Sequence, residues 1–379
     1  MIRLGDVATY INGYAFKPED RGEEGLPIIR IQDLTGNAHD LGFYNGEYPK
    51  KVEINDGDIL ISWSASLGVY IWSEGKALLN QHIFKVVFDK VAIDKNYFVY
   101  AVRRKLVEMG MKTHGATMKH IVKKDFDATL IPYPTLDKQA EIAANLNKVS
   151  SIIEAREQEL QLLDNLIKAR FVELFGDPIK NPKGWDVVKL SECLERIDNG
   201  KSFTCDSNAR EGAFPAILKL SAATYGDYRP YENKALLDEK QFVESVEVHR
   251  GDLLFTRKNT PDLVGMAAYV FETPEKLMMP DLIFRLVTNE RMTPIFLWQL
   301  INNREFRPVI QGISGGSAKS MSNISKERLK NIEVICPPIS EQKKLEGVLD
   351  QVDKSKVKVQ KALDETQKLF DSLMQQYFG

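Results

Sequence analysis

The sequence has very few residues that could build a redox, metal or disulfide centre. Among its 379 residues there are three cysteines and five histidines, and Cys193, Cys205 and Cys336 form no CxxC motif. Such wide spacing argues against a disulfide framework and against a zinc site, and it favours a reducing compartment. We therefore expect no metal and no cofactor on this chain.

The sequence also lacks a long hydrophobic run and an excess of one charge. No stretch reaches the roughly 18 apolar residues of a membrane span, and the opening MIRLGDVATYINGY has no apolar signal-peptide core. The formal net charge is -2, so the chain as a whole is not a polycation. We expect a cytoplasmic globular protein without a membrane partner, in which any nucleic-acid contact comes from local patches.

Motifs that would indicate catalysis are incomplete. GISGGSAKS lacks the glycine that precedes the lysine of a phosphate-binding loop, and NGKS has Glu195 where the first glycine of that motif belongs. The only Pro-Pro pair, in CPPI, is not part of the Asp/Asn-Pro-Pro-aromatic tetrad of base methyltransferases. A noncatalytic protein is therefore expected, and an enzyme with an unrecognised site is the least favoured alternative.

The most informative feature that is present is a long internal repeat. IPYPTLDKQAEIAANL is matched by ICPPISEQKKLEGVLD, and the alignment continues without a gap until both segments end on Phe-Gly. Matched pairs include Met118 and Met321, Pro134 and Pro337, Gln139 and Gln342, Leu146 and Leu349, and Leu160 and Leu363. Upstream, GDILISW matches GDLLFTR and HIFKVVF matches LIFRLVT, with an offset that drifts. A period of about 200 residues is too long for a solenoid, so the sequence predicts a duplicated domain.

Within each half, short apolar runs bounded by Gly, Asn and Asp predict strands, among them 27–31, 59–61, 69–72 and 83–88. A helix is predicted over 95–109, and its counterpart opens at Thr293, an N-cap followed by proline at the first helical position. Each half is therefore a mixed domain with a long helix behind it.

The end of each half carries an apolar stripe that alternates by three and four residues, which is typical of a coiled-coil seam. Asp137 and Ser340 are the predicted N-caps of these helices, and the two terminal glycines suit the left-handed residue that ends a helix. If a pseudo-twofold axis relates the halves, the helices run antiparallel and bury each other's stripe. The alternative is two separate amphipathic helices, each packed on its own domain. The predicted helix-pairing residues are Leu146, Val149, Ile153, Leu160, Leu163, Ile167, Leu349, Val352, Val359, Leu363 and Phe370.

These motifs together resemble the specificity (S) subunit of type I restriction-modification enzymes. RLGDVATYINGYAF and GWDVVKLSECLERIDNGKSF resemble the openings of its two target-recognition domains, and PTLDKQAEI and PPISEQKKL resemble the starts of its spacer helices. The resemblance implies an α+β fold, with two pseudo-twofold-related mixed α/β target-recognition domains (1–134 and 177–337) separated by two long antiparallel coiled-coil helices (135–176 and 338–379). The second half departs from the pattern, with MMPDLIFRL in place of LNQHIFKV.

The resemblance also implies a function. Each recognition domain would read one half of an asymmetric bipartite target in double-stranded DNA, and the helices would dock two methyltransferase (M) subunits, which recruit restriction/translocase (R) subunits. S-adenosylmethionine, ATP and Mg are then expected on those partners. The alternative is a protein-interaction scaffold whose loops do not touch DNA.

A basic, glycine-containing segment precedes the last strand of each half. Seven Lys or Arg lie between Arg103 and Lys124 against one acid, Glu108, and they surround HGATMKH. The second half repeats the arrangement with SGGSAKSMSN. Glycine and small hydroxyl residues allow a close approach to phosphate, although a charge run can also be only a solvated face. The predicted DNA-binding residues here are Lys112, Gly115, Thr117, Lys119, Ser317, Lys319 and Ser320.

The polar segment after each central strand differs between the halves, SWSAS against TRKNT, as two different base readers should. The alternative is an ordinary surface hairpin with Trp63 tucked in. The predicted DNA-binding residues are Ser62, Trp63, Ser64, Ser66, Arg257, Lys258, Asn259 and Thr260, with Phe16, Lys17, Arg30, Lys201 and Lys219 as secondary candidates. Arg30 and Lys219 could equally form structural salt bridges.

Overall fold

The structure is a computed structural model of the chain, and it describes residues 1–38, 40–112, 121–315 and 321–379. The chain forms two compact units: unit 1 comprises 1–157 and 360–379, and unit 2 comprises 158–359. Each unit therefore contains a mixed α/β domain and a stretch of both long helices. In the described part of the chain, no helix has the length and apolar character needed to cross a membrane.

Unit 1 is built on a four-stranded antiparallel sheet in the order β2-β9-β6-β7. A second sheet has the order β4-β3-β8-β5, in which β3 and β8 are parallel, and β1 pairs with β10. The strands are β1 (Ile2–Arg3), β2 (Thr9–Asn12), β3 (Leu26–Ile29), β4 (Gly42–Tyr44), β5 (Glu53–Ile54), β6 (Ile59–Ser62), β7 (Gly68–Ile71), β8 (Ala77–Leu79), β9 (Ile83–Val87) and β10 (Leu130–Ile131). The helices are α1 (Leu4–Val7), α2 (Ile31–Leu34), α3 (Lys95–Lys112) and α4 (Lys123–Ala128).

Unit 2 has a four-stranded antiparallel sheet in the order β12-β19-β15-β17, and a sheet β14-β13-β18 in which β13 and β18 are parallel. In addition, β11 pairs with β21, and β16 with β20. The strands are β11 (Val187–Lys189), β12 (Leu194–Asn199), β13 (Ala216–Leu218), β14 (Asn233–Ala235), β15 (Leu253–Thr256), β16 (Lys258–Asn259), β17 (Ala267–Tyr269), β18 (Leu277–Met278), β19 (Ile283–Thr288), β20 (Ser322–Asn323) and β21 (Glu333–Ile335). The helices are α6 (Pro294–Asn302), α7 (Arg307–Gly312) and α8 (Lys326–Lys330). Two long helices, α5 (Leu136–Phe175) and α9 (Ile339–Phe378), contribute to both units.

The two units share one topology, which confirms the predicted duplication. In both units the central antiparallel sheet has the same strand order, and a parallel pair lies in the second sheet. A matched glycine shows why this arrangement constrains the sequence. A Cβ atom on Gly13 would collide with the carbonyl oxygen of Asn80, and a Cβ on Gly200 would collide with that of Pro280. The two NG motifs therefore mark a close backbone approach that only glycine permits.

Most predicted elements are present, with shifted ends. The strand predicted over 27–31 stops at Ile29, because Ile31 already begins α2. The helix predicted over 95–109 is α3, which continues to Lys112. The N-cap predicted at Thr293 is confirmed, since its hydroxyl accepts a hydrogen bond from the amide of Phe296 at 3.2 Å.

The predicted N-caps of the long helices are wrong by a short distance along the chain. Hydrogen bonds of the first turns are accepted by the carbonyls of Thr135 and Pro338, so Asp137 and Ser340 already lie within the first turn. Their side chains are exposed there. At the other end of α5, the prediction for glycine is confirmed, because Gly176 has a φ of 77° in the left-handed region.

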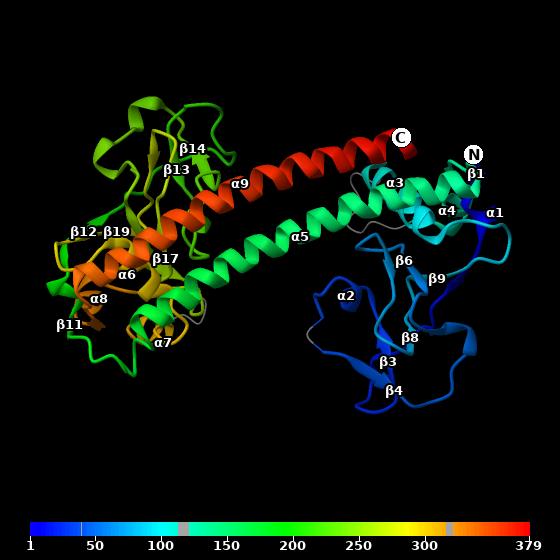
Figure 1. Cartoon of the computed structure of the whole chain (residues 1–379), viewed down its shortest axis with the longest axis horizontal. Helices are drawn as coiled ribbons and strands as arrows, with labels where there is room; N and C mark the ends of the chain where they lie inside the picture. Colours follow the sequence, from blue (N-terminus) through cyan, green and yellow to red (C-terminus); the bar gives the residue numbers. More distant parts are fainter. Residues whose placement is uncertain (39, 113–120, 316–320) are drawn as a thin grey trace. The chain divides into compact units, whose positions relative to one another are not determined.

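Within unit 1, α5 and α9 run side by side and antiparallel (Figure 1). Ile142 lies in the same core as Phe378. Further along, the guanidinium of Arg156 donates hydrogen bonds to the carbonyl of Ala362 and to the hydroxyl of Thr366. Residue numbers thus rise on α5 as they fall on α9, and a polar contact replaces the apolar seam at Arg156.

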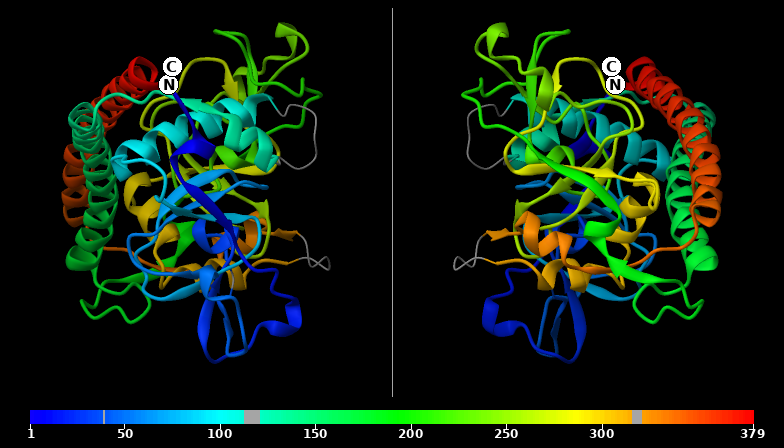
Figure 2. Two further views of the ribbon diagram at one scale, coloured as in Figure 1. Left: turned by 90° about the vertical axis from the view of Figure 1, so that its right-hand side faces the viewer. Right: turned by 90° about the vertical axis from the view of Figure 1, so that its left-hand side faces the viewer.

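Within unit 2 the two helices are again side by side and antiparallel (Figure 2). The ammonium of Lys356 pairs with Asp164 at 2.8 Å, and Phe175 lies in the same core as Leu345. The alternative of two helices that pack only on their own domains is therefore wrong. All predicted helix-pairing residues are buried or half-buried, namely Leu146, Val149, Ile153, Leu160, Leu163, Ile167, Leu349, Val352, Val359, Leu363 and Phe370.

Each long helix begins in one unit and ends in the core of the other. Phe175, the last residue of α5, is fully buried in unit 2, with its ring 4.8 Å from that of Phe296 on α6. Phe378, the last residue of α9, is buried in unit 1, with its ring 5.2 Å from that of Tyr97 on α3. These are matched positions of the repeat, so each half of the sequence completes the core that the other half begins.

A buried glutamine fixes the start of each long helix to its domain. In unit 1 the side chain of Gln139 accepts from the amide of Asp94 at 2.9 Å and donates to the carbonyl of Pro134 at 2.8 Å. In unit 2 the side chain of Gln342 accepts from the amide of Thr293 at 2.8 Å, and its Nε2 donates to two backbone carbonyls. Both side chains are fully buried, so these bonds are shielded from water.

Candidate nucleic-acid interface

In unit 2, the polar segment after the central strand lies against the segment that follows the glycine-rich loop. β16 pairs with β20, so that Lys258 is opposite Asn323. Next to this ladder, the amide of Ile324 donates to the carbonyl of Arg257 at 2.8 Å. Two motifs that the sequence identified separately, TRKNT and the stretch after SGGSAKS, therefore form one surface element.

Unit 1 repeats this connection with different side chains. The amide of Ile121 donates to the carbonyl of Trp63 at 3.0 Å, and these residues are the repeat matches of Ile324 and Arg257. The scaffold that joins the two predicted loops is thus common to both units. Trp63 in one unit and Arg257 in the other occupy equivalent positions on it.

Trp63 and Arg257 each lie over a phenylalanine at a matched position of the repeat. The indole of Trp63 stacks on Phe84 with centroids 5.5 Å apart, and the guanidinium of Arg257 lies 5.0 Å from the centroid of Phe284. A lysine also lies over each ring. Its ammonium is 6.0 Å from the Phe84 centroid for Lys123, and 5.5 Å from that of Phe284 for Lys326. Cation–π contacts of this kind hold a positive charge in place beside the predicted loops. The basic segments identified in the sequence already included Lys123 and Lys326, and the HIFKVVF and LIFRLVT match contained both phenylalanines, but none of the four was among the predicted DNA-binding residues.

The structure corrects the prediction for two of the serines in unit 1. Ser62 is fully buried at the end of β6, and its hydroxyl donates to the carbonyl of Ser66 at 2.5 Å. Ser64 is also buried. Because both residues are buried, neither is in a position to contact a base. Ser66 is exposed and keeps that role as a prediction.

The side chain of Trp63 is half-buried and makes structural contacts. Its ring is edge-on to His82 at 5.0 Å, and its Nε1 donates to Asn12 at 3.3 Å. Trp63 therefore packs against its own domain, as the surface-hairpin alternative predicts. A structural role for Trp63 therefore accompanies the predicted contact with DNA.

In unit 2, the predicted base-contacting residues differ in burial and in how many hydrogen bonds they make within the protein. Asn259 is buried, and its Nδ2 donates to Thr224 at 3.1 Å, so it positions the loop rather than reading bases. Arg257 and Lys258 are half-buried, and Thr260 is exposed. The guanidinium of Arg257 makes only long hydrogen bonds, at 3.4 Å, to Asp281 and to Asn323. Its Nε meets no acceptor among the described residues.

Several predicted residues lie outside the described part of the chain. These are Gly115, Thr117, Lys119, Ser317, Lys319 and Ser320. Lys112 is the last residue of α3. Their assignment as DNA-binding residues stays a prediction.

Two cations of the basic segment in unit 1 form ion pairs and hydrogen bonds within the protein. Arg104 and Lys105 both pair with Glu108, and both also reach the end of α9, at the side chain of Gln375 and the carbonyl of Phe378. These cations therefore hold α9 in unit 1 and are not available to phosphate. The charge density of this segment overstated the number of cations that DNA could contact.

The secondary candidates divide into structural and exposed residues. Arg30 forms a two-pronged salt bridge with Asp33 at 2.8 and 3.0 Å, and this hydrogen bonding raises the pKa of the guanidinium. Lys219 lies 3.6 Å from Glu232. Arg30 and Lys219 therefore form salt bridges, as the structural alternative predicted. Phe16 is buried against two tyrosines, whereas Lys17 and Lys201 are exposed.

An exposed aromatic and basic cluster in unit 2 was missed. The guanidinium of Arg229 lies 4.6 Å from the ring centroid of Tyr225, and it pairs with Asp227 at 2.8 Å, which raises the pKa of Arg229. Tyr231 is 67% exposed. The signal was present in YGDYRPY, which places three tyrosines and an arginine within seven residues, a composition that suits stacking and phosphate contact.

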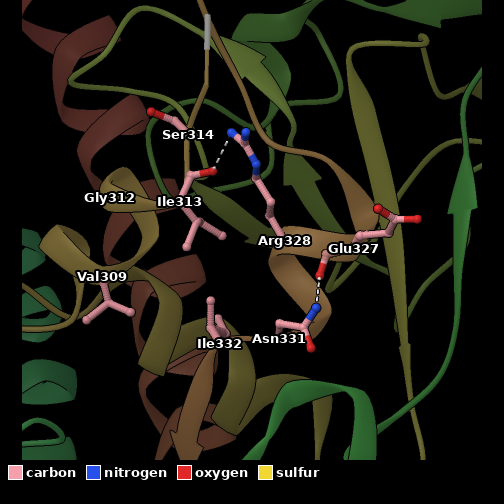
Figure 3. Close-up of a pocket in the computed structure, with 8 residues that line it drawn as sticks. All are labelled: Val309, Gly312, Ile313, Ser314, Glu327, Arg328, Asn331 and Ile332. Carbon is pink, nitrogen blue, oxygen red and sulfur yellow. Dashed lines mark hydrogen bonds between the residues drawn. The ribbon is translucent and has the colours of Figure 1, made fainter.

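A pocket of about 730 Å³ lies beside the second glycine-rich segment (Figure 3). It is formed by the end of α7, by α8 and by the residues that follow each of them. Arg328 closes one side and donates to the carbonyl of Ile313 at 3.4 Å, while Asn331 donates to the carbonyl of Glu327 at 2.9 Å. Arg328 therefore places a positive charge on one wall of the pocket, next to Ser314.

Among residues 1–38, 40–112, 121–315 and 321–379, no cluster of His, Cys, Asp and Glu has the arrangement of a metal site. The polar groups described above are suited to hydrogen bonding and stacking.

Comparison with known families gives a match over most of the chain. The family described as "Type I restriction modification DNA specificity domain" matches residues 1–165 and again residues 182–366. The two matched ranges correspond to the two copies of the repeat.

Individual relatives are distant in sequence. The MjaVIII type I specificity subunit of Methanocaldococcus jannaschii is 23% identical over 372 residues, covering 93% of this chain and 85% of the relative. The EcoBI specificity subunit of Escherichia coli is 28% identical over 170 residues, covering 44% of this chain, and the EcoEI subunit is 29% identical over 203 residues, covering 52%. These two alignments span only 35% and 34% of the length of the Escherichia coli proteins.

Solved structures share the fold. The S subunit of a type I restriction-modification system from M. genitalium superposes with a TM-score of 0.56 at 14% identity, covering 100% of this chain and 95% of that chain. A structure from work on assembly and conformational transition of the type I R-M system gives 0.55 at 16% identity, covering 99% and 96%.

Proposed function

Because this chain belongs to the type I restriction-modification DNA specificity family, we propose that it is a DNA-recognition subunit in which each unit reads one half of an asymmetric bipartite target in double-stranded DNA. The observation that supports this most directly is the repeated backbone bond between the two predicted loops, Ile121 to Trp63 in unit 1 and Ile324 to Arg257 in unit 2. One scaffold carries two different side chains at the equivalent position. A duplicated scaffold with different readers suits a target whose halves differ.

The proposal includes the partners. Two M subunits dock on the long helices, which offer equivalent positions to identical partners because the halves are duplicated. R subunits join through that complex. The chain itself is noncatalytic, S-adenosylmethionine, ATP and Mg belong to the partner subunits, and the complex works in the cytoplasm. The duplicated helices and the divergent loops support this assignment.

A domain exchange tests the proposal. Residues 1–134 are replaced by a recognition domain from another family member, and the chimera is combined with its M subunits. We expect one half of the methylated sequence to change and the other half to stay, because each unit reads separately. Because Phe378 packs on Tyr97, the donor domain should carry a tyrosine at the position of Tyr97. Long-read mapping of methylated adenine gives the readout.

The reciprocal exchange of residues 177–337 is the matched control, and it should change only the other half. A change of both halves by either graft, or of neither half with methylation intact, would contradict separate reading. A pure interaction scaffold predicts the last of these outcomes.

Arg257→Ala tests a single reader in unit 2. A guanidinium can make two hydrogen bonds to guanine, so its loss should relax one base position at a cost of about 1–3 kcal/mol. The measurement is binding of the assembled methyltransferase to duplexes varied at each target position. Arg257→Lys keeps the charge over Phe284 but loses the planar fork, and it should relax the same position. An unchanged preference in both variants would remove Arg257 from the reading set.

A further inference from the structure

Cys193 and Cys336 lie side by side in unit 2 although 143 residues separate them in the chain. Cys193 is fully buried directly before β12, and Cys336 is half-buried directly after β21. The thiol of Cys193 donates a hydrogen bond to the sulfur of Cys336, with the two Sγ atoms 3.9 Å apart. Cys205 lies apart from this pair, and its thiol donates to the carbonyl of Phe203 at 3.4 Å.

The pair belongs to unit 2 alone. The register of the repeat places Val7 at the position of Cys193 and Tyr133 at that of Cys336. Val7 is fully buried, as Cys193 is, so the scaffold accepts an aliphatic side chain at this position. The hydroxyl of Tyr133 donates to the carbonyl of Ala92 at 2.7 Å. Packing of the fold therefore does not require two sulfur atoms here.

The surroundings favour a thiolate at Cys336. The hydrogen bond from Cys193 lowers the pKa of Cys336 to about 7, and the positive charge of Arg291 acts in the same direction. Burial opposes this shift, as do the negative charges of Asp186 and Glu192. Glu192 is paired with Arg291 at 3.0 Å. The pKa of Cys193 is raised by its bond to Cys336 and by burial.

Cys336 can be reached from outside, whereas Cys193 cannot. A pocket of about 430 Å³ has Cys336 in its wall, together with Trp185, Asp186, Arg291 and Pro337. This volume admits a small polar reagent. Cys193 does not line the pocket, so a reagent in it meets the Cys336 sulfur first.

We propose that Cys336 and Cys193 form a peroxide-sensitive dithiol, in which Cys336 is the attacking thiolate and Cys193 the resolving thiol. The proposal rests on the adjacency of the two sulfur atoms, on the pocket that exposes only one of them, and on the replacement of both residues in the matched unit. It goes beyond DNA recognition and does not depend on it.

The reaction is a two-electron oxidation by a hydroperoxide. The Cys336 thiolate attacks one peroxide oxygen, an S–O bond forms, the O–O bond breaks, and the leaving oxygen takes a proton, which gives a sulfenic acid. The sulfur of Cys193 then attacks the sulfenic sulfur, an S–S bond forms, and the S–O oxygen leaves as water with the proton of Cys193. The sulfur atoms must approach from 3.9 Å to about 2.05 Å in the disulfide.

The disulfide would act on the start of α9. The carbonyl of Arg291 accepts hydrogen bonds from the thiol of Cys336 at 3.6 Å and from the Nε2 of Gln342 at 3.0 Å. A bond between Cys193 and Cys336 would tie β12 to the residue that immediately precedes the Pro-Pro entry into α9. Oxidation would thereby fix the junction between the domain and the helix.

The test uses the full chain, reduced and then exposed to a small excess of hydrogen peroxide at neutral pH. We expect two of the three thiols to be lost, Cys205 to remain alkylatable, and unreduced peptide mapping to show Cys193 linked to Cys336. Dithiothreitol should restore both thiols. A link through Cys205, links between chains, or retention of all thiols under conditions that oxidise a model dithiol would overturn the proposal.

Matched variants separate chemistry from folding. Cys193→Val copies the residue of unit 1 and should keep the fold, while Cys336 stops at a sulfenic acid that dimedone traps. In the unmodified chain, alkylation of Cys336 should be half-maximal near pH 7, and in Cys193→Val this midpoint should rise because the hydrogen bond is gone. Cys205→Ser should change nothing. An unmoved alkylation midpoint together with no dimedone adduct would contradict the assigned roles, and neither result bears on the proposed DNA recognition.

Discussion

Phe378→Ala is expected to destabilise unit 1 by about 3–5 kcal/mol, the usual range for removing a buried phenylalanine ring. The result is unexpected from the position of Phe378 in its helix, because it is the last residue of α9 and helix ends commonly fray. Here the side chain is only 1% exposed, and it lies in the same core as Ile142 and Leu146. Its carbonyl also accepts from Lys105 at 3.2 Å.

Hydrogen exchange locates this effect. The amides of α3 should exchange about a hundred to several thousand times faster in the variant, since each 1.4 kcal/mol is a factor of ten when opening is the unfolding of this region. The amides of α6, in unit 2, should be much less affected. Urea unfolding of the full chain should show the corresponding loss of stability.

Two further substitutions on the same pattern serve as controls. Phe175→Ala removes the matched ring from unit 2 and should reverse the pattern, with faster exchange in α6. Leu369→Ala lies on α9 but is 51% exposed, so it should change stability by no more than about 0.5 kcal/mol. Equal protection of α3 in Phe378→Ala and in the unmodified chain would show that α9 does not complete the core of unit 1.

Gln342→Leu is the second substitution for which a large effect is expected. Leucine matches the size of glutamine, but it leaves the amide of Thr293 without its acceptor and the carbonyl of Pro337 without its donor. The carbonyl of Arg291 keeps only its contact with the thiol of Cys336 at 3.6 Å. Because the side chain of Gln342 is fully buried, each group that loses its hydrogen-bond partner costs about 1–3 kcal/mol. We expect a loss of at least about 3 kcal/mol, measured by urea unfolding and by exchange of the first turns of α9 and α6.

The repeat provides a matched control for this substitution too. Gln139→Leu should destabilise unit 1 through Asp94 and Pro134 and leave the first turn of α6 protected. In Gln342→Glu, a buried carboxylate would face two carbonyls, which raises its pKa in the folded state. The folded state then binds more protons than the unfolded state, so the stability of this variant should fall as pH rises. A Gln342→Leu chain as stable as the original would show that water replaces the lost bonds.

The residues behind the Gln342 and Phe378 predictions differ in how much of their role the sequence indicates. Gln139 and Gln342 stood out as a matched pair in the repeat, but nothing local indicates that a glutamine in a helix is buried. Phe175 and Phe378 were visible as shared ends, and their partners were not. Heptad spacing predicts that a helix has a seam, whereas the unit in which each end is buried depends on residues far away in the chain.

The sequence identified TRKNT and the segment near SGGSAKS separately as candidate DNA-binding loops. The structure shows that strands β16 and β20 pair there, which the sequence did not predict. The sequence also did not separate Thr260, which is exposed, from Asn259, which is buried. Exposure of a polar side chain after a strand depends on which neighbour offers it a hydrogen bond, and here that neighbour is Thr224.

The sequence by itself determined the duplication, the class of the elements that it predicted and the apolar seam of the long helices, because these follow from periodicity within short windows and from an ungapped repeat. Only the tertiary structure decided which cations are held by the fold, as Arg104 and Arg30 are, and which distant residues meet, as Cys193 and Cys336 do. The reason is physical. A charge or a thiol acquires its role from groups within a few ångströms, and the path of the chain, which no local pattern encodes, places those groups there.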